Sequence, residues 1–65
     1  MTYICFIESS ILSVPHMEPL SAADVDEARE EARRLLSRHA SGIAAHVFAG
    51  EKRVHTIRAE ELQRA

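Results

Sequence analysis

The chain has 65 residues, of which 46% are hydrophobic and 28% charged, and its formal net charge is −2 at pH 7. This length allows one domain, and the charge lacks the basic excess expected of a nucleic-acid-binding protein. A disulfide within the chain is excluded, because Cys5 is its only cysteine.

A domain of this size is expected to need support beyond its own core. Chains of about 60 residues bury only about 60% of the surface that their unfolded form exposes. Without a disulfide, the remaining supports are a metal, unusually good packing or a partner subunit. The apolar run Tyr3–Ile7 is too short for a signal peptide or a membrane span, so we expect a cytoplasmic protein.

Residues 1–20 are expected to form a β-hairpin. Its first strand is the β-branched and aromatic segment Tyr3–Ile7, closed by the turn-forming Ser9 and Ser10. Tyr3, Cys5 and Ile7 would lie on one face of this strand, and Ile4 and Phe6 on the other. Both faces are apolar, which indicates a strand covered on both sides.

The second half of this hairpin contains Pro15 and Pro19. Proline donates no ladder hydrogen bond, so this segment is expected to be an edge strand or an irregular arm.

Residues 21–40 are expected to form a helix. Ser21 is the expected N-cap, Asp24 stands at the capping-box position, and Leu20 and Val25 have the spacing of a hydrophobic staple. Acidic residues crowd the first half of the segment and basic residues its last turns, which complements the helix dipole. The apolar stripe consists of Val25, Ala28, Ala32, Leu35 and Leu36.

Residues 43–58 are expected to form a second hairpin, with strands near Ala44–Ala49 and Lys52–Ile57. A glycine-first loop at Gly50-Glu51 is typical of a type II′ turn. This loop sets Val47 against Val54 and His46 against His55, whereas a loop at Ala49-Gly50 would set His46 against Arg53. We prefer the register set by the Gly50-Glu51 loop. The remaining segment, 59–65, is expected to be a tail that either adds a helical turn or frays.

In that register the two faces of the second hairpin differ. Ala45, Val47, Ala49, Val54 and Thr56 form a small apolar face suited to lie beneath the helix. The other face mixes aromatic, Arg and His side chains, which is typical of interfaces. Together with the first strand it predicts an interface made of Ile4, Phe6, His46, Phe48, Arg53, His55 and Ile57.

The expected architecture is therefore α+β, a small antiparallel ββαββ sheet with one helix packed on one face. One helix cannot cover both faces of a four-stranded sheet. We therefore expect a homodimer that covers the second face, with a further, unidentified protein partner as an additional expectation.

Four histidines make a metal site worth weighing. His46 and His55, opposite each other, would have Cα atoms about 4.5 Å apart, but a zinc site normally needs three or four protein ligands. We therefore expect no cofactor and interpret the pair as part of the interface. Cys5 lies in an apolar strand and is expected to be inert, so no catalytic residue is predicted. The arginines of the helix are offset by its acids, and we expect no nucleic-acid partner.

The segment "HVFAGEKRVHTI" resembles the closing hairpin of very small alphaproteobacterial proteins of unknown function, with the pattern V-[FW]-x-G-x-[RK]-x-V. Val47, Phe48, Gly50, Lys52 or Arg53, and Val54 match it. In "ADVDEAREEARRLL" the alanine-spaced positions Ala28, Ala32 and Leu36 match their helix. The prolines of "VPHMEP" depart from the pattern. The resemblance implies a bacterial hairpin–helix–hairpin protein, and it carries no activity or catalytic residue over to this chain.

A second, weaker similarity is to small antitoxin domains, which place strands before an "EAxxxAxxxL" helix. Asp26–Leu36 is similar to that helix, but the separate DNA-binding segment is absent. The sequence thus favours a non-catalytic, self-associating interaction or accessory module. The alternatives are an antitoxin-like regulatory domain and a metal or ligand binder that uses a histidine-bearing dimer face.

Overall fold

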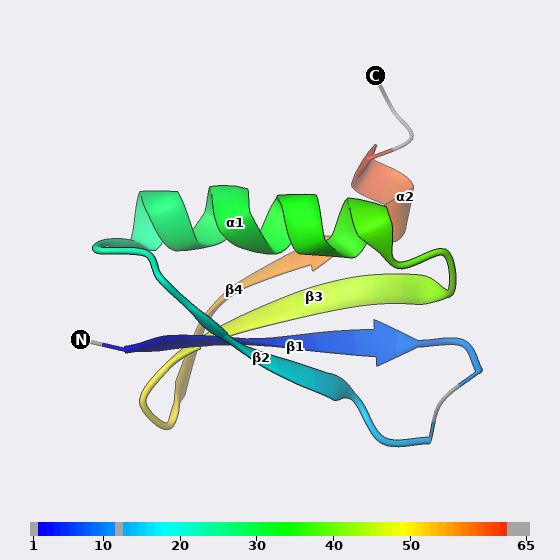
Figure 1. The fold of residues 1–65 in the computed structure, drawn as a ribbon, viewed down its shortest axis with the longest axis horizontal. Coiled ribbons are helices and arrows are strands. Elements are labelled where there is room, and N and C mark those ends of the chain that lie inside the picture. Colours follow the sequence, from blue (N-terminus) through cyan, green and yellow to red (C-terminus); the bar gives the residue numbers. More distant parts are fainter. Residues whose placement is uncertain (1, 12, 63–65) are drawn as a thin grey trace.

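The computed structural model of the protein describes residues 2–11 and 13–62. Four strands form one antiparallel sheet in the order β2-β1-β3-β4, and the long helix α1 packs on one face of it (Figure 1). This confirms the expected ββαββ α+β fold. The elements are β1 Tyr3–Ser9, β2 His16–Leu20, α1 Val25–Arg38, β3 Gly42–Ala49, β4 Lys52–Arg58 and α2 Ala59–Leu62.

The central strand β1 has the two apolar faces that its sequence predicts. Tyr3, Cys5 and Ile7 point toward α1 and are buried, whereas Ile4 and Phe6 point the other way and are half-buried. β1 pairs with β2 on one side and with β3 on the other.

β2 is an edge strand, as its prolines predict. It pairs with β1 without a register shift, from Tyr3 opposite Leu20 to Ile7 opposite His16. Pro19 lies within the strand, which an edge position allows because its missing N–H then leaves no ladder bond unmade.

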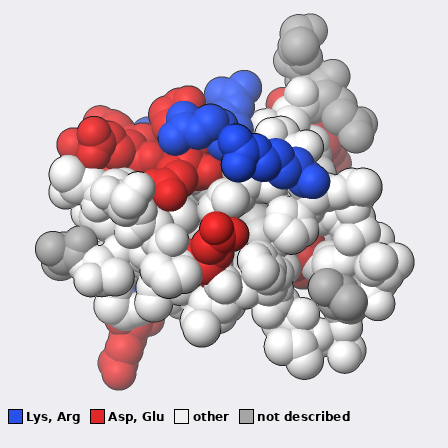
Figure 2. Space-filling model, viewed as in Figure 1, with Lys and Arg blue, Asp and Glu red and all other residues white. Residues whose placement is uncertain are grey.

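The charges of α1 follow the order expected from the helix dipole. Acidic side chains gather over its N-terminal end and basic side chains lie further along it (Figure 2). Asp26 and Glu27 lie in its first turn and Arg38 in its last. Each charged side chain at the end of the helix dipole that favours it stabilises the helix by about 0.3–1 kcal/mol.

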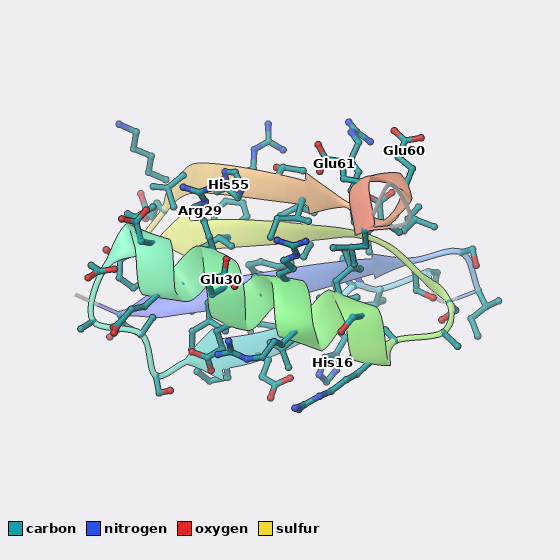
Figure 3. All side chains as sticks on the ribbon, turned by 90° about the horizontal axis from the view of Figure 1, so that it is seen from above. His16, Arg29, Glu30, His55, Glu60 and Glu61 are labelled. Atoms are coloured by element: carbon teal, nitrogen blue, oxygen red, sulfur yellow. The ribbon has the colours of Figure 1, made fainter. Side chains whose placement is uncertain are left out.

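The core lies between α1 and the sheet. Small residues on α1, Ala28 and Ala32, are fully buried and let the helix approach the strands closely, and Leu36 fills the space at its C-terminal end. Opposite them lie Cys5, Ile7 and Val47, all fully buried. Seen from above, α1 crosses the sheet obliquely, and β4 forms one margin of the sheet (Figure 3).

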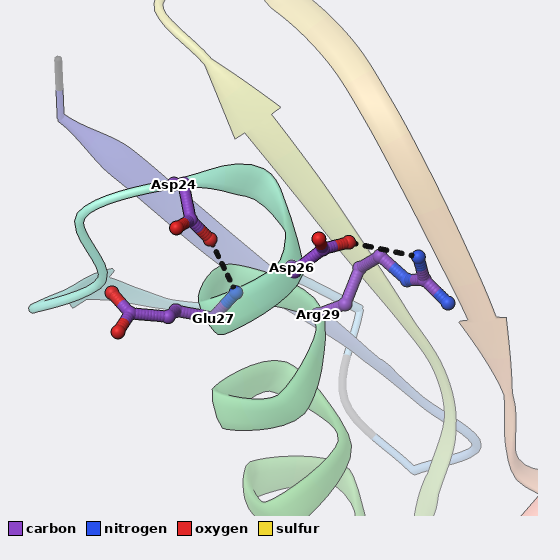
Figure 4. A network of polar contacts seen from close by, with 4 residues as sticks. All are labelled: Asp24, Asp26, Glu27 and Arg29. Carbon is purple, nitrogen blue, oxygen red and sulfur yellow. Dashed lines mark hydrogen bonds and ion pairs between the residues drawn. The ribbon is translucent and has the colours of Figure 1, made fainter.

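The N-cap of α1 differs from the predicted one. Asp24 is the cap: its Oδ1 accepts a hydrogen bond of 2.9 Å from the backbone N–H of Glu27 (Figure 4). Glu27 in turn accepts one of 2.8 Å from the N–H of Ala23. Ser21, the predicted cap, lies outside the helix and donates its N–H to Glu31 instead. Asp24 and Glu27 therefore cap α1 three residues later than predicted, with the Glu27 carboxylate bound to the N–H of Ala23, one residue before the cap, and α1 is shorter than the predicted 21–40.

The β3–β4 hairpin has the predicted loop. Ala49 faces Lys52 and Phe48 faces Arg53 across Gly50-Glu51. Gly50 has φ 64°, and no other described residue has a positive φ, which fits the type II′ turn.

Beyond the loop, the predicted register of β4 is wrong. A β-bulge at Val54 shifts the pairing, so Val47 faces His55 and His46 faces Thr56. Val54 and Ile57 both pack with the core although they are three residues apart. In a regular strand two such residues would point to opposite faces, and the extra residue of a bulge allows both to be buried.

The tail begins with the short helix α2, where the N–H of Arg58 donates to Glu61 at 2.8 Å. The predicted tail continues to residue 65, and its last three residues lie outside the described part of the chain. Within residues 2–11 and 13–62, no helix is long and apolar enough to cross a membrane.

Candidate functional site

The sheet face that points away from α1, called the open face below, collects most of the residues predicted for an interface. Strand alternation and the pairing of the four strands place its members. They are Ile4, Phe6 and Glu8 of β1, Met17 of β2, Ala44, His46 and Phe48 of β3, and Arg53, Thr56 and Arg58 of β4.

Two aromatic rings form the apolar centre of the open face. Phe6 of β1 and Phe48 of β3 have ring centroids 5.2 Å apart and an interplanar angle of 76°. This edge-to-face geometry is the favoured one for aromatic pairs. Ile4 faces Phe48 across the strands, and all three side chains stay half-exposed.

A hydrogen-bonded set of three residues crosses the open face beside the rings. Nε2 of His46 lies 3.1 Å from Oε1 of Glu8, and its Nδ1 lies 3.1 Å from Oγ1 of Thr56. An ionised carboxylate only accepts, so Nε2 donates to Glu8. In the neutral ring, Nδ1 then accepts from the Thr56 hydroxyl. The set ties β1, β3 and β4 together and fixes the orientation of the imidazole.

A shallow hollow of about 240 Å³ lies on the open face. It is lined by Phe6, Phe48, His46, Arg53 and Pro15, the last of which belongs to the loop between β1 and β2. The hollow therefore offers an apolar floor with one guanidinium and one imidazole beside it.

The loop between β1 and β2 extends this apolar surface. Ile11 and Val14 are 77% and 73% exposed. Met17 of β2, which lies opposite Phe6 on the open face, is 57% exposed. In Figure 2 the surface below α1 is mostly uncharged. Val14 precedes Pro15, which lines the hollow together with Phe6 and Phe48, so the loop brings further apolar residues to the rim of the open face.

Two residues predicted for the interface do not lie on the open face. The bulge at Val54 turns His55 and Ile57 toward α1. Ile57 is 7% exposed and belongs to the core, and His55 is half-buried between α1 and β4. Their assignment to the second face is wrong, whereas Ile4, Phe6, His46, Phe48 and Arg53 do share that face.

The same shift separates the two histidines considered for a metal. His46 points to the open face and His55 to the helix side, so the two rings do not meet. Among residues 2–11 and 13–62, no group of three or more His, Cys, Asp and Glu is placed to hold a metal ion.

Sequence reasoning missed Glu8 and Thr56. Glu8 follows Phe6 by two residues, so strand alternation alone would have placed it on the open face. Thr56 reaches this face only through the bulge, for which the spacing of Val54 and Ile57 was the available signal.

Fold and surface together define a small α+β protein in which α1 covers one face of the sheet and, within residues 2–11 and 13–62, no helix covers the other. Comparison with protein-family models, with curated proteins and with solved structures finds no match. The resemblance to small alphaproteobacterial proteins therefore stays a prediction.

Proposed function

We propose that this protein is a non-catalytic, self-associating interaction module whose open face packs against the open face of a second copy. The observation that carries this proposal is the apolar patch of Ile4, Phe6, Phe48 and Met17 on the open face, beside the hollow that Pro15 also lines. Contiguous exposed apolar patches on small proteins mark interaction sites. Burying this patch supplies the second apolar layer that a single helix cannot.

The charges of the open face favour a second copy as the partner. Glu8 lies on β1, whereas Arg53 and Arg58 lie on β4. Two sheets that pack face to face keep their strands within about 30° of each other. A symmetric pair with its axis along the strands lays β4 of one copy over β1 and β2 of the other. Each Arg58 then comes near the Glu8 of the other copy, so the surface complements itself.

The size of the face sets the expected strength. Four strands about 4.8 Å apart, with about 3.3 Å per residue over seven residues, cover about 450 Å² per copy before the loop is added. This is below the roughly 800 Å² per partner of a standard interface. We therefore expect a dissociation constant in the micromolar range and a dimer that exchanges with monomer.

The test is sedimentation equilibrium of the wild type and of two matched variants. Met17→Glu places a charge on the open face, and we expect dimerisation at least tenfold weaker. Val25→Glu introduces the same charge at an apolar residue of α1 that is 38% exposed and lies away from the open face, and we expect no change. A wild type that stays monomeric near 1 mM would contradict self-association and would mean that the apolar patch binds a partner other than a second copy.

Substitution of two histidines that lie on opposite faces of the sheet gives a second test of the dimer. His46 lies on the open face and His55 on the helix side, so His46→Ala should weaken the dimer and His55→Ala should not. Equal effects of both substitutions would count against packing through the open face. Circular dichroism of each variant separates loss of dimer from loss of fold.

A further inference from the structure

The margin of the sheet formed by β4 carries only basic charge. β4 contains Lys52, Arg53, His55 and Arg58 and no acidic residue. It is the last strand in the order β2-β1-β3-β4, so one of its sides pairs with β3 and the other has no strand partner in the described part of the chain. None of these four side chains takes part in an ion pair within residues 2–11 and 13–62.

A hollow of about 220 Å³ lies beside this margin on the helix side. His55 and Arg29 face it from β4 and α1 (Figure 3), and Arg33 follows one turn along α1. Its apolar lining comes from Ile57 and Leu62. Glu30 and Glu61 complete the lining. The lining of this hollow is thus more polar than apolar and carries charges of both signs, whereas the open-face side of β4 is purely basic.

We propose that β4 binds an extended peptide with alternating acidic and apolar residues, which adds to the sheet as a fifth strand. Strand addition pairs the free N–H and C=O groups of an edge strand with those of the peptide. Successive side chains of the added strand point to opposite faces. Those on the open-face side lie beside Arg53 and Arg58 and are acidic; those on the helix side enter the hollow toward Ile57 and Leu62 and are apolar.

Two other occupants fit this margin less well. Pairing with β4 of a second copy would set basic strands against each other, and like charges on neighbouring strands are destabilising. The bulge at Val54 also twists the margin away from a second flat edge, while a flexible peptide can follow it. A nucleic acid would meet the basic side chains but leave the backbone groups of β4 unpaired. The acidic peptide matches both features.

The experiment is fluorescence anisotropy with the labelled peptide Ser-Glu-Val-Glu-Val-Glu-Val-Ser and the full-length protein. Three probes of equal length serve as controls: the same peptide with Lys for Glu, the same acidic peptide N-methylated at every second residue, and an oligo-dT strand. We expect the acidic peptide to bind at least tenfold more tightly than each control, with an affinity that falls as salt increases.

Variants locate the site. The double substitution Arg53→Glu/Arg58→Glu should weaken acidic-peptide binding at least tenfold. Arg34→Glu/Arg38→Glu makes the same change in charge on α1, away from β4, and should change binding less than twofold. Met17→Glu should leave peptide binding intact even where it abolishes the dimer, so this inference and the proposed function can fail separately.

Three results would overturn the inference. N-methylated peptide that binds as tightly as the parent would show that strand pairing is not used. Oligo-dT that binds more tightly than the peptide would identify a nucleic-acid surface instead. Equal loss in both double variants would show that only net charge matters. Circular dichroism of each variant establishes that it is folded before its binding is measured.

Discussion

Neighbouring residues of β1 meet opposite surroundings. Cys5 lies under α1 and is fully buried, whereas Phe6, the next residue, packs against Phe48 on the open face. Burial raises the pKa of the Cys5 thiol to about 11, with smaller contributions from the carboxylates of Glu18 and Glu31. The thiol is therefore neutral at physiological pH and behaves as a small apolar group.

This raised pKa predicts a loss of stability at alkaline pH. The folded state disfavours the thiolate, so the contribution of Cys5 is complete below its ordinary pKa of 9.0 and is lost as pH rises toward 11. The loss amounts to roughly 2 to 3 kcal/mol at most. Urea unfolding of wild type and Cys5→Ala should show their free-energy difference shrinking between pH 8 and pH 11. A constant difference would mean that the buried thiol ionises as freely as an exposed one.

The cap of α1 gives a second prediction at a single residue. Asp24→Ala removes the acceptor of the Glu27 N–H and should cost about 1 kcal/mol of unfolding free energy. Ser21→Ala removes only an exposed hydroxyl 3.4 Å from Glu31 and should cost less than half as much. Thermal or urea unfolding of the two variants compares them directly. A larger loss of unfolding free energy in Ser21→Ala than in Asp24→Ala would identify Ser21 as the cap.

At the scale of elements, the sequence predicts those features that depend on local chemistry. The apolar alternation of β1, the edge position of a proline-bearing β2 and the Gly50-Glu51 loop all follow from a few neighbouring residues, and the structure agrees with each. The predicted start of α1 is three residues too early because Ser21 and Asp24 are both good caps. Only Asp24 is followed three residues later by a Glu, and this Glu27 accepts a hydrogen bond from the N–H of Ala23.

The spacing of Val54 and Ile57 indicates the bulge of β4 only once both side chains are known to be buried, and neighbouring residues alone do not show that. The bulge forms because Val54 and Ile57 both pack beneath α1, and this burial depends on a helix some twenty residues earlier in the chain. Because the sequence predicts a regular ladder here, it assigns His55 and Ile57 to the open face, where they do not lie, and does not assign Thr56 to it. Five of the seven predicted interface residues kept their face, because they lie in β1, in β3 or before the bulge.

Cross-linking tests this register directly. In a Cys5→Ala background, His46→Cys/Thr56→Cys places two thiols opposite each other on one face. We expect it to form a disulfide readily under mild oxidation, because facing Cα atoms lie about 4.5–5.5 Å apart. The pair His46→Cys/His55→Cys points to opposite faces and should remain reduced. Mass spectrometry after alkylation distinguishes the two, and preferential bridging of the second pair would support the regular ladder.

At the scale of the whole molecule, one helix and one sheet provide a thin core. The chain extends 30 × 29 × 16 Å, so its shortest dimension holds little more than two layers. A domain of this size is only marginally stable by itself. A second copy on the open face would add stability by mass action.

Thermal unfolding should therefore depend on protein concentration. If dimerisation is coupled to stability, the Tm of the wild type should rise by several degrees between 5 µM and 500 µM, and the Tm of Met17→Glu should not. Differential scanning calorimetry at several concentrations measures this. A concentration-independent wild-type Tm would mean that the monomer is as stable as any assembly it forms.

The bulge at Val54 also determines where the chain can change its length. Without Val54, Arg53 would still face Phe48 and His55 would still face Val47, now in an unbroken ladder, and no other side chain would change face. Removing Thr56 instead would carry Ile57 out of the core to the open face. We expect the first deletion to give a folded protein and the second to give none by circular dichroism. Val54 is thus the position in β4 where the chain can lose one residue while every remaining side chain keeps its face.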